Sequence, residues 1–278
     1  MEFHHLRSFI VVAQTGNVTK AAKQLYTTPP AVSAHLKSLE DELSTQLFVR
    51  SSKGMMLTDK GRILLPKAEK TLSSALDLVN HAASQQNELI GSIRIGINQP
   101  SNVLSLDTTL NKLTKLAPGI DTEIAYGSSG ELVEKVVNDQ LDIAYAYGEI
   151  PNELVARSIK TQELIVVAPN KFNLNNDANK PDLQGLPWID VGVNCPFTSL
   201  TKKYFGKNID IVTSAADDVT RLSLVKAGLG LSFIEKDIAQ SIENITCLPQ
   251  FTIEAELKLI YKREREGNPL INAYLSAI

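Results

Sequence analysis

The sequence has no hydrophobic run that approaches the roughly 20 apolar residues of a membrane span, so we expect no membrane partner. Its first residues include Glu2, His4 and His5 rather than an apolar signal segment, which predicts a cytoplasmic protein. Cysteine is scarce as well. Cys195 and Cys247 are the only two among 278 residues, and this favours reduced thiols over a disulfide framework.

The usual motifs of α/β enzymes are also missing. No Gly-x-Gly-x-x-Gly and no phosphate-binding lysine loop follows the first predicted strand, and no histidine beyond His81 is present for a catalytic triad. The Gly-Ser-Ser-Gly run at 127–130 does not have the order of a nucleophile elbow, and the His4-His5 pair lacks metal-ligand spacing. We therefore expect no enzymatic activity, no catalytic residues, no metal and no cofactor.

Charge is distributed unevenly along the chain, which is long enough for two or three compact units. Residues 1–90 contain 10 Lys and Arg against 8 Asp and Glu, whereas the remainder contains 18 against 23. A mildly basic head on an acidic body suits a nucleic-acid-binding domain joined to a module of another kind.

Residues 17–43 predict two short helices with a tight turn between them. Asn17 is a suitable N-cap for a helix over residues 19–25, and Pro29 is placed where proline favours the start of the next helix. This second helix carries an apolar stripe at helical spacing, which we expect to be buried and which consists of Val32, Leu36, Leu39 and Leu43.

The opposite face of the second helix offers small or hydrogen-bonding groups and one cation, so it is able to approach base edges in the major groove. We interpret residues 17–43 as a helix-turn-helix, with an ordinary helical hairpin as the alternative. Residues 48–58 predict a β-hairpin with Gly54 in its turn, which would form a wing that contacts phosphate or the minor groove. The candidate DNA-binding residues are Thr28, Pro29, Pro30, Ser33, Ala34 and Lys37 on the helix and Arg50 and Lys53 on the wing.

Thr58 is a suitable N-cap for a long helix that extends to about Gln86. Apolar residues alternate spacings of three and four along it, at Leu65, Ala68, Leu72, Ala75, Val79 and Ala82. Such a heptad seam is typical of a coiled-coil contact, so we expect the helix to pair two copies of the chain. The alternative is a helix that packs on its own domain. A polar linker is predicted at 84–88.

From Gly91 onward the pattern is that of an α/β fold. Predicted strands alternate with predicted helices, which indicates parallel βαβ units in two similar lobes joined by two crossing strands. The C-terminal strand and helix are expected to return to the first lobe. The predicted strands cover 92–97, 121–126, 141–146, 164–168, 188–191, 209–213, 229–234 and 256–261, and the helices cover 102–116, 129–138, 198–205 and 216–226.

These segments resemble the LysR-type transcriptional regulators. Within the first 65 residues the resemblance is carried by LRSFIVVAQTGNVTKAAKQL, PPAVSAHLKSLEDEL, LFVR and LTDKGRILLP, and later by GSIRIG, GSSGELVEKVVNDQLDIAYAYG and LVKAGLGLSFI. The resemblance implies an α/β protein with an α-rich N-terminal winged helix-turn-helix at 1–58, a dimerising linker helix at 59–90 and a two-lobed effector domain, similar to periplasmic binding proteins, at 91–278. Lobe one would comprise about 91–162 and 256–278, and lobe two about 169–248.

The resemblance also implies partners. They are double-stranded DNA, a second copy of the chain in a homodimer, a homotetramer built from dimers, and RNA polymerase if the protein is an activator. Two residues depart from the family pattern: Pro29 replaces a usual glutamine, and Ser44 replaces a usual glycine. The first change removes one hydrogen-bonding contact, so the operator preference is expected to differ.

In paired α/β lobes, ligands bind beyond the carboxyl ends of the strands, and by resemblance effectors contact these loops. The loops are rich in hydroxyls and amides and contain no Arg or Lys, which predicts a small neutral or singly anionic metabolite. Ser129 and Thr198 would serve equally well as helix caps. The candidate effector-binding residues are Asn98, Gln99, Ser101, Asn102, Ser128, Ser129, Tyr147, Asn194, Phe197 and Thr198.

Three other functions remain open from sequence. A ligand-independent DNA-binding repressor would keep the head and ignore metabolites. A redox-sensing regulator would use Cys195 together with Cys247. A solute-binding protein would explain the lobes but not the head.

Overall fold

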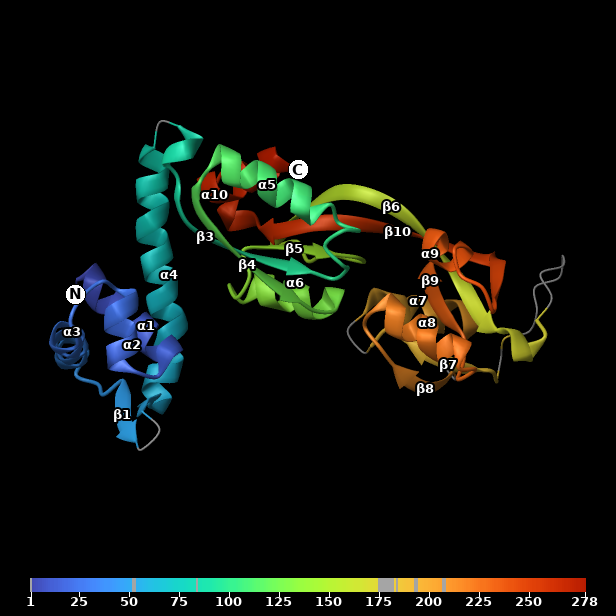
Figure 1. Ribbon diagram of the computed structural model, residues 1–278, viewed down its shortest axis with the longest axis horizontal. Coiled ribbons are helices and arrows are strands. Elements are labelled where there is room, and N and C mark those ends of the chain that lie inside the picture. Colours follow the sequence, from blue (N-terminus) through green and yellow to red (C-terminus); the bar gives the residue numbers. More distant parts are fainter. Residues whose placement is uncertain are drawn as a thin grey trace. The chain divides into compact units, whose positions relative to one another are not determined.

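The computed structural model describes residues 2–51, 54–83, 85–174, 183, 185–192, 195–206 and 209–278. The chain divides into two compact units, Met1–Ser84 and Gln85–Ile278 (Figure 1). The long helix that the sequence assigned to a segment of its own is part of the first unit. Among the described residues, no helix has both the length and the apolar character that crossing a membrane requires.

The first unit is a helical domain with one β-hairpin. Its core contains buried side chains from the first three helices, the hairpin and Ala68 of the fourth helix. The elements are α1 (Phe3–Thr15), α2 (Val18–Gln24), α3 (Pro29–Glu42), β1 (Phe48–Ser51), β2 (Gly54–Leu57) and α4 (Asp59–Ala82). The predicted helix-turn-helix and wing are therefore confirmed as structural elements.

The helix starts follow the predicted capping. The Asn17 side chain accepts a hydrogen bond from the backbone N–H of Lys20 at 3.0 Å, and Thr58 accepts one from the N–H of Gly61 at 2.9 Å. The prediction that Leu43 is buried is wrong, since the residue is 39% exposed. The cause is that α3 ends at Glu42 and the chain turns at Ser44, whose φ of 48° is the left-handed conformation that glycine adopts without strain.

The first half of the apolar seam of α4 packs within the first unit. Leu65, Ala68 and Leu72 contact the core of the helical domain, which agrees with the alternative prediction of a helix that packs on its own domain. Further along, Leu78 is 75% exposed and Val79 is 54% exposed. Val79 belongs to the predicted seam and Leu78 is its neighbour outside it, so the second half of α4 presents apolar side chains on the surface of this unit.

The second unit contains two α/β lobes. Lobe one has its core around α6, β5 and the end of β10, and lobe two around β6, β7, α8 and β9. The elements are β3 (Ile90–Ile97), α5 (Leu106–Leu116), β4 (Gly119–Tyr126), α6 (Ser129–Val137), β5 (Ile143–Ala146), β6 (Leu154–Pro169), β7 (Pro187–Asp190), α7 (Pro196–Phe205), β8 (Asp210–Ser214), α8 (Asp218–Lys226), β9 (Ser232–Glu235), α9 (Lys236–Gln240), β10 (Ile245–Lys262) and α10 (Pro269–Ala277).

Two long strands join the lobes, as predicted. β6 and β10 have 16 and 18 residues and pair antiparallel along most of their length, and Figure 1 shows them running side by side between the lobes. The six-stranded sheet has the order β4-β3-β5-β10-β6-β9. In lobe one, β10 pairs antiparallel with β5, and in lobe two, β9 pairs with β6. The parallel pair β7-β8 completes lobe two.

A buried carboxylate fixes the C-terminal segment to lobe one. Asp142 is 5% exposed and accepts hydrogen bonds at 3.0 Å from Nε and from an Nη atom of Arg94 on β3, and it also pairs with Arg265. Burial alone would raise the pKa of Asp142, but the hydrogen bonds and charges of Arg94 and Arg265 outweigh burial and hold that pKa below its ordinary value.

We expect Asp142→Asn to lower the free energy of unfolding of the second unit by about 3 kcal/mol, because two cations then lose their counter-charge in a buried position. Acidification should also lower the free energy of unfolding. The stabilisation by Asp142 is present above its unfolded-state pKa and is lost as the pH falls through its lower folded-state pKa. Thermal and urea unfolding measure both effects.

The matched control is Asp139→Asn, in the same lobe. Asp139 pairs with Lys262 at 2.8 Å in a more exposed position, so its loss should cost less than about 1 kcal/mol. Equal destabilisation by the two variants would contradict the assigned role of Asp142.

Candidate functional site

The outer face of α3 presents the predicted DNA-binding residues together. Val32, Leu36 and Leu39 are buried on the inner face, so helical periodicity turns the other side of α3 outward. Thr28, Pro29, Pro30, Ala34, Lys37 and, on β1, Arg50 are exposed, and Ser33 is half-buried. Lys53 lies outside the described residues. The surface is thus free of large side chains over the first two turns of the helix.

Two sets of hydrogen bonds fix α3 within its unit. Ser8 Oγ of α1 lies 2.8 Å from Nδ1 of His35. Glu40 accepts two backbone hydrogen bonds at its Oε1, from Leu47 N at 2.7 Å and from Phe48 N at 3.1 Å, which ties α3 to the first strand of the wing. Glu40 was not among the residues predicted from sequence, because an acidic residue at the end of a helix gives little signal that it accepts hydrogen bonds from the next strand.

The wing is also attached to the turn after α1. The N–H of Met55 donates to the carbonyl oxygen of Gly16 at 2.9 Å. Gly54 has a φ of 115°, and a Cβ atom there would lie 2.4 Å from the same Gly16 oxygen. Only glycine fits this approach of two backbones, so the glycine that marked the predicted turn also permits docking of the wing.

Within the second unit, a cavity of about 140 Å³ lies between the lobes. From lobe one it is lined by Asn98, Gln99, Ser128, Ser129 and Tyr147, and from lobe two by Phe197, all of which were predicted. Ser101 and Asn102 are exposed and are not among the described residues that line the cavity, although Pro100 and Val103 on either side of them are. Asn194 lies outside the described residues.

A polar network organises the lobe-one wall. The Ser129 Oγ accepts hydrogen bonds from Asn98 Nδ2 and from the N–H of Tyr147, both at 3.1 Å. Gln162 of β6 accepts from Gln99 Nε2 at 3.3 Å and from the Tyr147 hydroxyl. The Ser128 side chain caps α6 by accepting a hydrogen bond from the N–H of Glu131. The capping role that the sequence suggested for Ser129 therefore belongs to Ser128.

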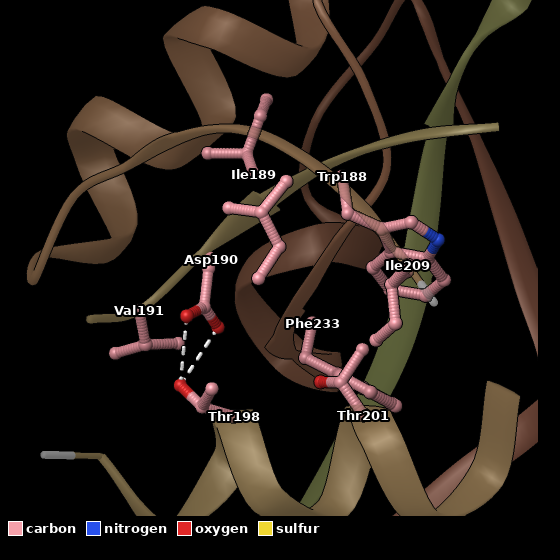
Figure 2. A pocket seen from close by; sticks show the side chains of 9 residues that line it. Trp188, Ile189, Asp190, Val191, Thr198, Thr201, Ile209 and Phe233 are labelled. Carbon is pink, nitrogen blue, oxygen red and sulfur yellow. Dashed lines mark hydrogen bonds between the residues drawn. The ribbon is translucent and has the colours of Figure 1, made fainter. Parts of the chain in front are cut away.

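Thr198 does not face this cavity. It lines a crevice of about 10 Å³ inside lobe two, where its hydroxyl lies 2.8 Å from Asp190 Oδ1 and 2.7 Å from the Gly192 carbonyl oxygen (Figure 2). Figure 2 shows Trp188, Phe233 and Ile209 around the same crevice, which has room for about one water molecule. The Thr198 hydroxyl is therefore used within the lobe.

The cavity between the lobes also contains four charged residues that the sequence analysis missed. They are Asp217, Asp218 and Arg221 at the start of α8 and Glu235 at the end of β9. The expectation of a site without arginine or lysine is wrong for this reason. The loop after β8 was omitted from the predicted ligand loops, although it too follows the carboxyl end of a parallel strand.

A second, larger cavity of about 790 Å³ shares part of the same wall. Ser129, Tyr147, Cys195 and Phe197 line both cavities, and the rings of Tyr147 and Phe197 lie 5.1 Å apart across the lobes. Cys195 is buried, and its burial raises the pKa of the thiol to about 11. Few thiolates form at neutral pH, which argues against a reactive cysteine.

Two family profiles match the chain. One described as "Bacterial regulatory helix-turn-helix protein, lysR family" covers residues 3–62. The other, described as "LysR substrate binding domain", covers residues 86–278.

Similar proteins are transcriptional regulators. A probable RuBisCO transcriptional regulator of Cyanidium caldarium is 28% identical over 280 residues, which cover 94% of this chain and 88% of the relative. The HTH-type transcriptional regulator CzcR of Bacillus anthracis is 34% identical over 183 residues, 65% of this chain and 62% of that protein. YofA of Bacillus subtilis (strain 168) is 25% identical over 274 residues, 95% and 93% of the two chains.

Solved structures share the fold over the full length. A full-length CbnR in complex with its target DNA has a TM-score of 0.62 at 19% identity and covers 100% of this chain and 99% of that one. A full-length OxyR variant from Pseudomonas aeruginosa has a TM-score of 0.70 at 20% identity, with 100% and 97% coverage.

We predict that Glu40→Ala loosens the wing, because the N–H groups of Leu47 and Phe48 lose their acceptor. The cost should be about 1–3 kcal/mol in the unfolding free energy of the first unit. Glu40→Gln keeps an acceptor oxygen and should cost less. Hydrogen exchange at Leu47 and Phe48 measures the effect locally, and unchanged protection in Glu40→Ala would contradict it.

We also predict that peroxide leaves DNA affinity unchanged, in the wild type and in Cys195→Ser alike, because the buried thiol stays protonated. Electrophoretic mobility shifts before and after peroxide treatment provide the measurement. A loss of affinity in the wild type that Cys195→Ser abolishes would show a redox function.

Proposed function

Since this chain belongs to the LysR family of DNA-binding transcriptional regulators, we propose that it contacts double-stranded DNA through α3 and the wing and that a small metabolite between the lobes controls it. The observation that carries the DNA contact is the outer face of α3. Its small exposed side chains leave room for base edges. Its relatives are transcriptional regulators, not enzymes.

We assign the proposed contacts by their place on the surface. Lys37 lies on the exposed face of α3 and reaches base edges or adjacent phosphates. Arg50 lies on the exposed side of the wing and contacts phosphate or the minor groove, together with Lys53. Pro29 provides no side-chain hydrogen bond, so the operator should differ from those of family members that carry glutamine there.

The proposed assembly is a dimer through α4 and a tetramer of such dimers. Leu78 and Val79 supply exposed apolar surface on the second half of the helix, as a pairing seam requires. RNA polymerase is a further partner if the protein activates transcription. We place the protein in the cytoplasm, where it has access to the genome.

The metabolite is proposed to bind in the 140 Å³ cavity, between Asn98, Ser129 and Tyr147 on one side and Phe197 and the start of α8 on the other. Binding there would change the angle between the lobes, because β6 and β10 are the connection about which they move. The sequence predicts a neutral or a singly anionic metabolite. The acidic residues of the cavity disfavour the anionic one.

The two alternatives are separated by experiment. A ligand-independent repressor would bind DNA equally in the presence of any metabolite. A redox sensor would need a reactive thiol, which the burial of Cys195 disfavours.

We expect Lys37→Ala and Arg50→Ala to weaken binding to DNA in different ways. Lys37→Ala should cost about tenfold or more on the operator and reduce discrimination against random DNA, since a base-edge contact is lost. Arg50→Ala should weaken both DNAs alike and lower the salt slope by about 1, since a phosphate contact is lost. Fluorescence anisotropy across a salt series, with the promoter next to the protein's own gene, measures all of these.

Lys115→Ala, an exposed lysine on α5 in the second unit, is the control for a general loss of positive charge. Identical effects of Lys37→Ala and Arg50→Ala on specific and random DNA would contradict the division of roles. A salt slope near zero for the wild type would refute phosphate contact altogether.

A further inference from the structure

The charges of the cavity between the lobes do not balance. Asp217, Asp218 and Glu235 line it together with Arg221, and the charge of Lys160 acts on Glu235 from β6. Among the described residues that line the cavity, three carboxylates therefore face one cation, and Lys160 and Asp237 act on Glu235 with opposite signs, so negative charge is in excess. Because an unpaired charge is costly in a poorly solvated place, a ligand that brings one positive charge is favoured there and an anion is disfavoured.

Arg221 and Lys160 are both already engaged. Arg221 is buried, and its guanidinium donates to the carbonyl oxygens of Ala215 at 2.8 Å and Ala216 at 2.9 Å and pairs with Asp218. The Nζ of Lys160 donates to the Val103 carbonyl oxygen at 3.3 Å. Neither is placed to receive a carboxylate in the bidentate manner that arginine offers when its fork is open.

Four buried polar atoms on residues that line the cavity lack a hydrogen-bond partner among the described residues. Three are acceptors, namely Asn98 Oδ1, Gln99 Oε1 and Glu235 Oε2, and one is a donor, Arg221 Nε, on a side chain that is 5% exposed. Buried polar groups are normally paired, so unpaired atoms around a cavity point to something that binds there. The complement is a molecule with a cationic donor for Glu235 and an acceptor for Arg221 Nε.

The charge of the lobe-two carboxylates acts on tyrosines of the opposite wall. Burial raises the pKa of Glu235 against the charge of Lys160 and a hydrogen bond with Gln162, and burial also raises the pKa of Asp218, whereas a backbone hydrogen bond holds the pKa of Asp217 below its ordinary value. Burial together with the charges of Glu235 and Asp218 raises the pKa of Tyr147, and burial together with Asp217 and Asp218 raises that of Tyr126. These tyrosines lie on lobe one and the carboxylates on lobe two, so the negative potential extends across the cavity.

We propose that the cavity binds a small organic monocation, an amine that also carries a hydrogen-bond acceptor such as a carbonyl or hydroxyl oxygen. The protonated amine donates to Glu235 in the field of Asp217 and Asp218, and the acceptor oxygen receives Arg221 Nε–H. The amides of Asn98 and Gln99 complete the site from lobe one. This assignment rests on the proposed control by a metabolite and specifies its chemical class.

The test uses three probes of similar size that differ in charge. At neutral pH, L-alaninamide is a cation, lactamide is neutral and lactate is an anion. Calorimetric titration of the full-length protein at neutral pH should give alaninamide at least about tenfold tighter binding than the other two, the range of a charge-assisted hydrogen bond. Tighter binding of lactate or lactamide, or binding of none of the three, overturns the proposal.

Two variants test the assigned residues. Glu235→Gln keeps the shape and removes the charge, and Asp217→Asn keeps a good helix cap for α8, so both should fold and lose most of the preference for alaninamide over lactamide. Glu256→Gln, which removes a carboxylate from the larger cavity, should keep that preference. An unchanged preference in both Glu235→Gln and Asp217→Asn would refute the assignment.

The same samples separate this proposal from the proposed function. If alaninamide binds with the expected preference but leaves operator affinity unchanged, the cation site stands and metabolite control through this cavity fails. If lactate binds most tightly and shifts operator affinity, metabolite control stands and the cation site fails.

Discussion

The antiparallel pairing of β6 with β10 is the constraint on which the second unit depends. Since each strand is long enough to belong to both lobes, the two lobes are joined through one shared sheet. Register shifts occur in the pairing between Leu248 and Thr252 and between Leu257 and Lys258, which allow a continuous ladder to bend. The cavity lies where the polar ends of lobe-one elements and the start of α8 come close, and it exists only because this ladder holds both lobes.

The first unit is organised by a different requirement. The outer face of α3, where we propose DNA contact, is bare, and the contacts described above that position α3 come from its inner face and its end. The apolar stripe, the Ser8–His35 hydrogen bond and the Glu40 carboxylate meet that requirement and leave the outer face exposed. The wing depends on one close approach of two backbones, at Gly16 and Gly54, which joins residues almost 40 positions apart. A DNA-binding surface therefore arises from what the core does not use.

The cavity shows how a site acquires a character that none of its segments has alone. Its lobe-one loops are rich in amides and hydroxyls, and by themselves they favour a neutral or anionic ligand. The charge comes from α8 and β9, on the other lobe. Arg221, the cation among the described residues that line the cavity, pairs with Asp218 and donates to two backbone carbonyls, so its presence does not make the site attractive to anions.

The sequence by itself determined most of the elements and their order, but not α9 or the full length of β6 and β10. Helical spacing marked the buried face of α3, capping residues marked the starts of α2 and α4, and alternating strands and helices marked two lobes, because these signals are local and depend on neighbouring residues. Tertiary structure alone decided that Leu43 is exposed, that Thr198 turns to Asp190 inside lobe two, and that Ser101 and Asn102 are exposed and do not line the cavity. It also decided the charge of the cavity, since Arg221 and Glu235 meet Asn98 and Tyr147 only after long strands bring distant segments together.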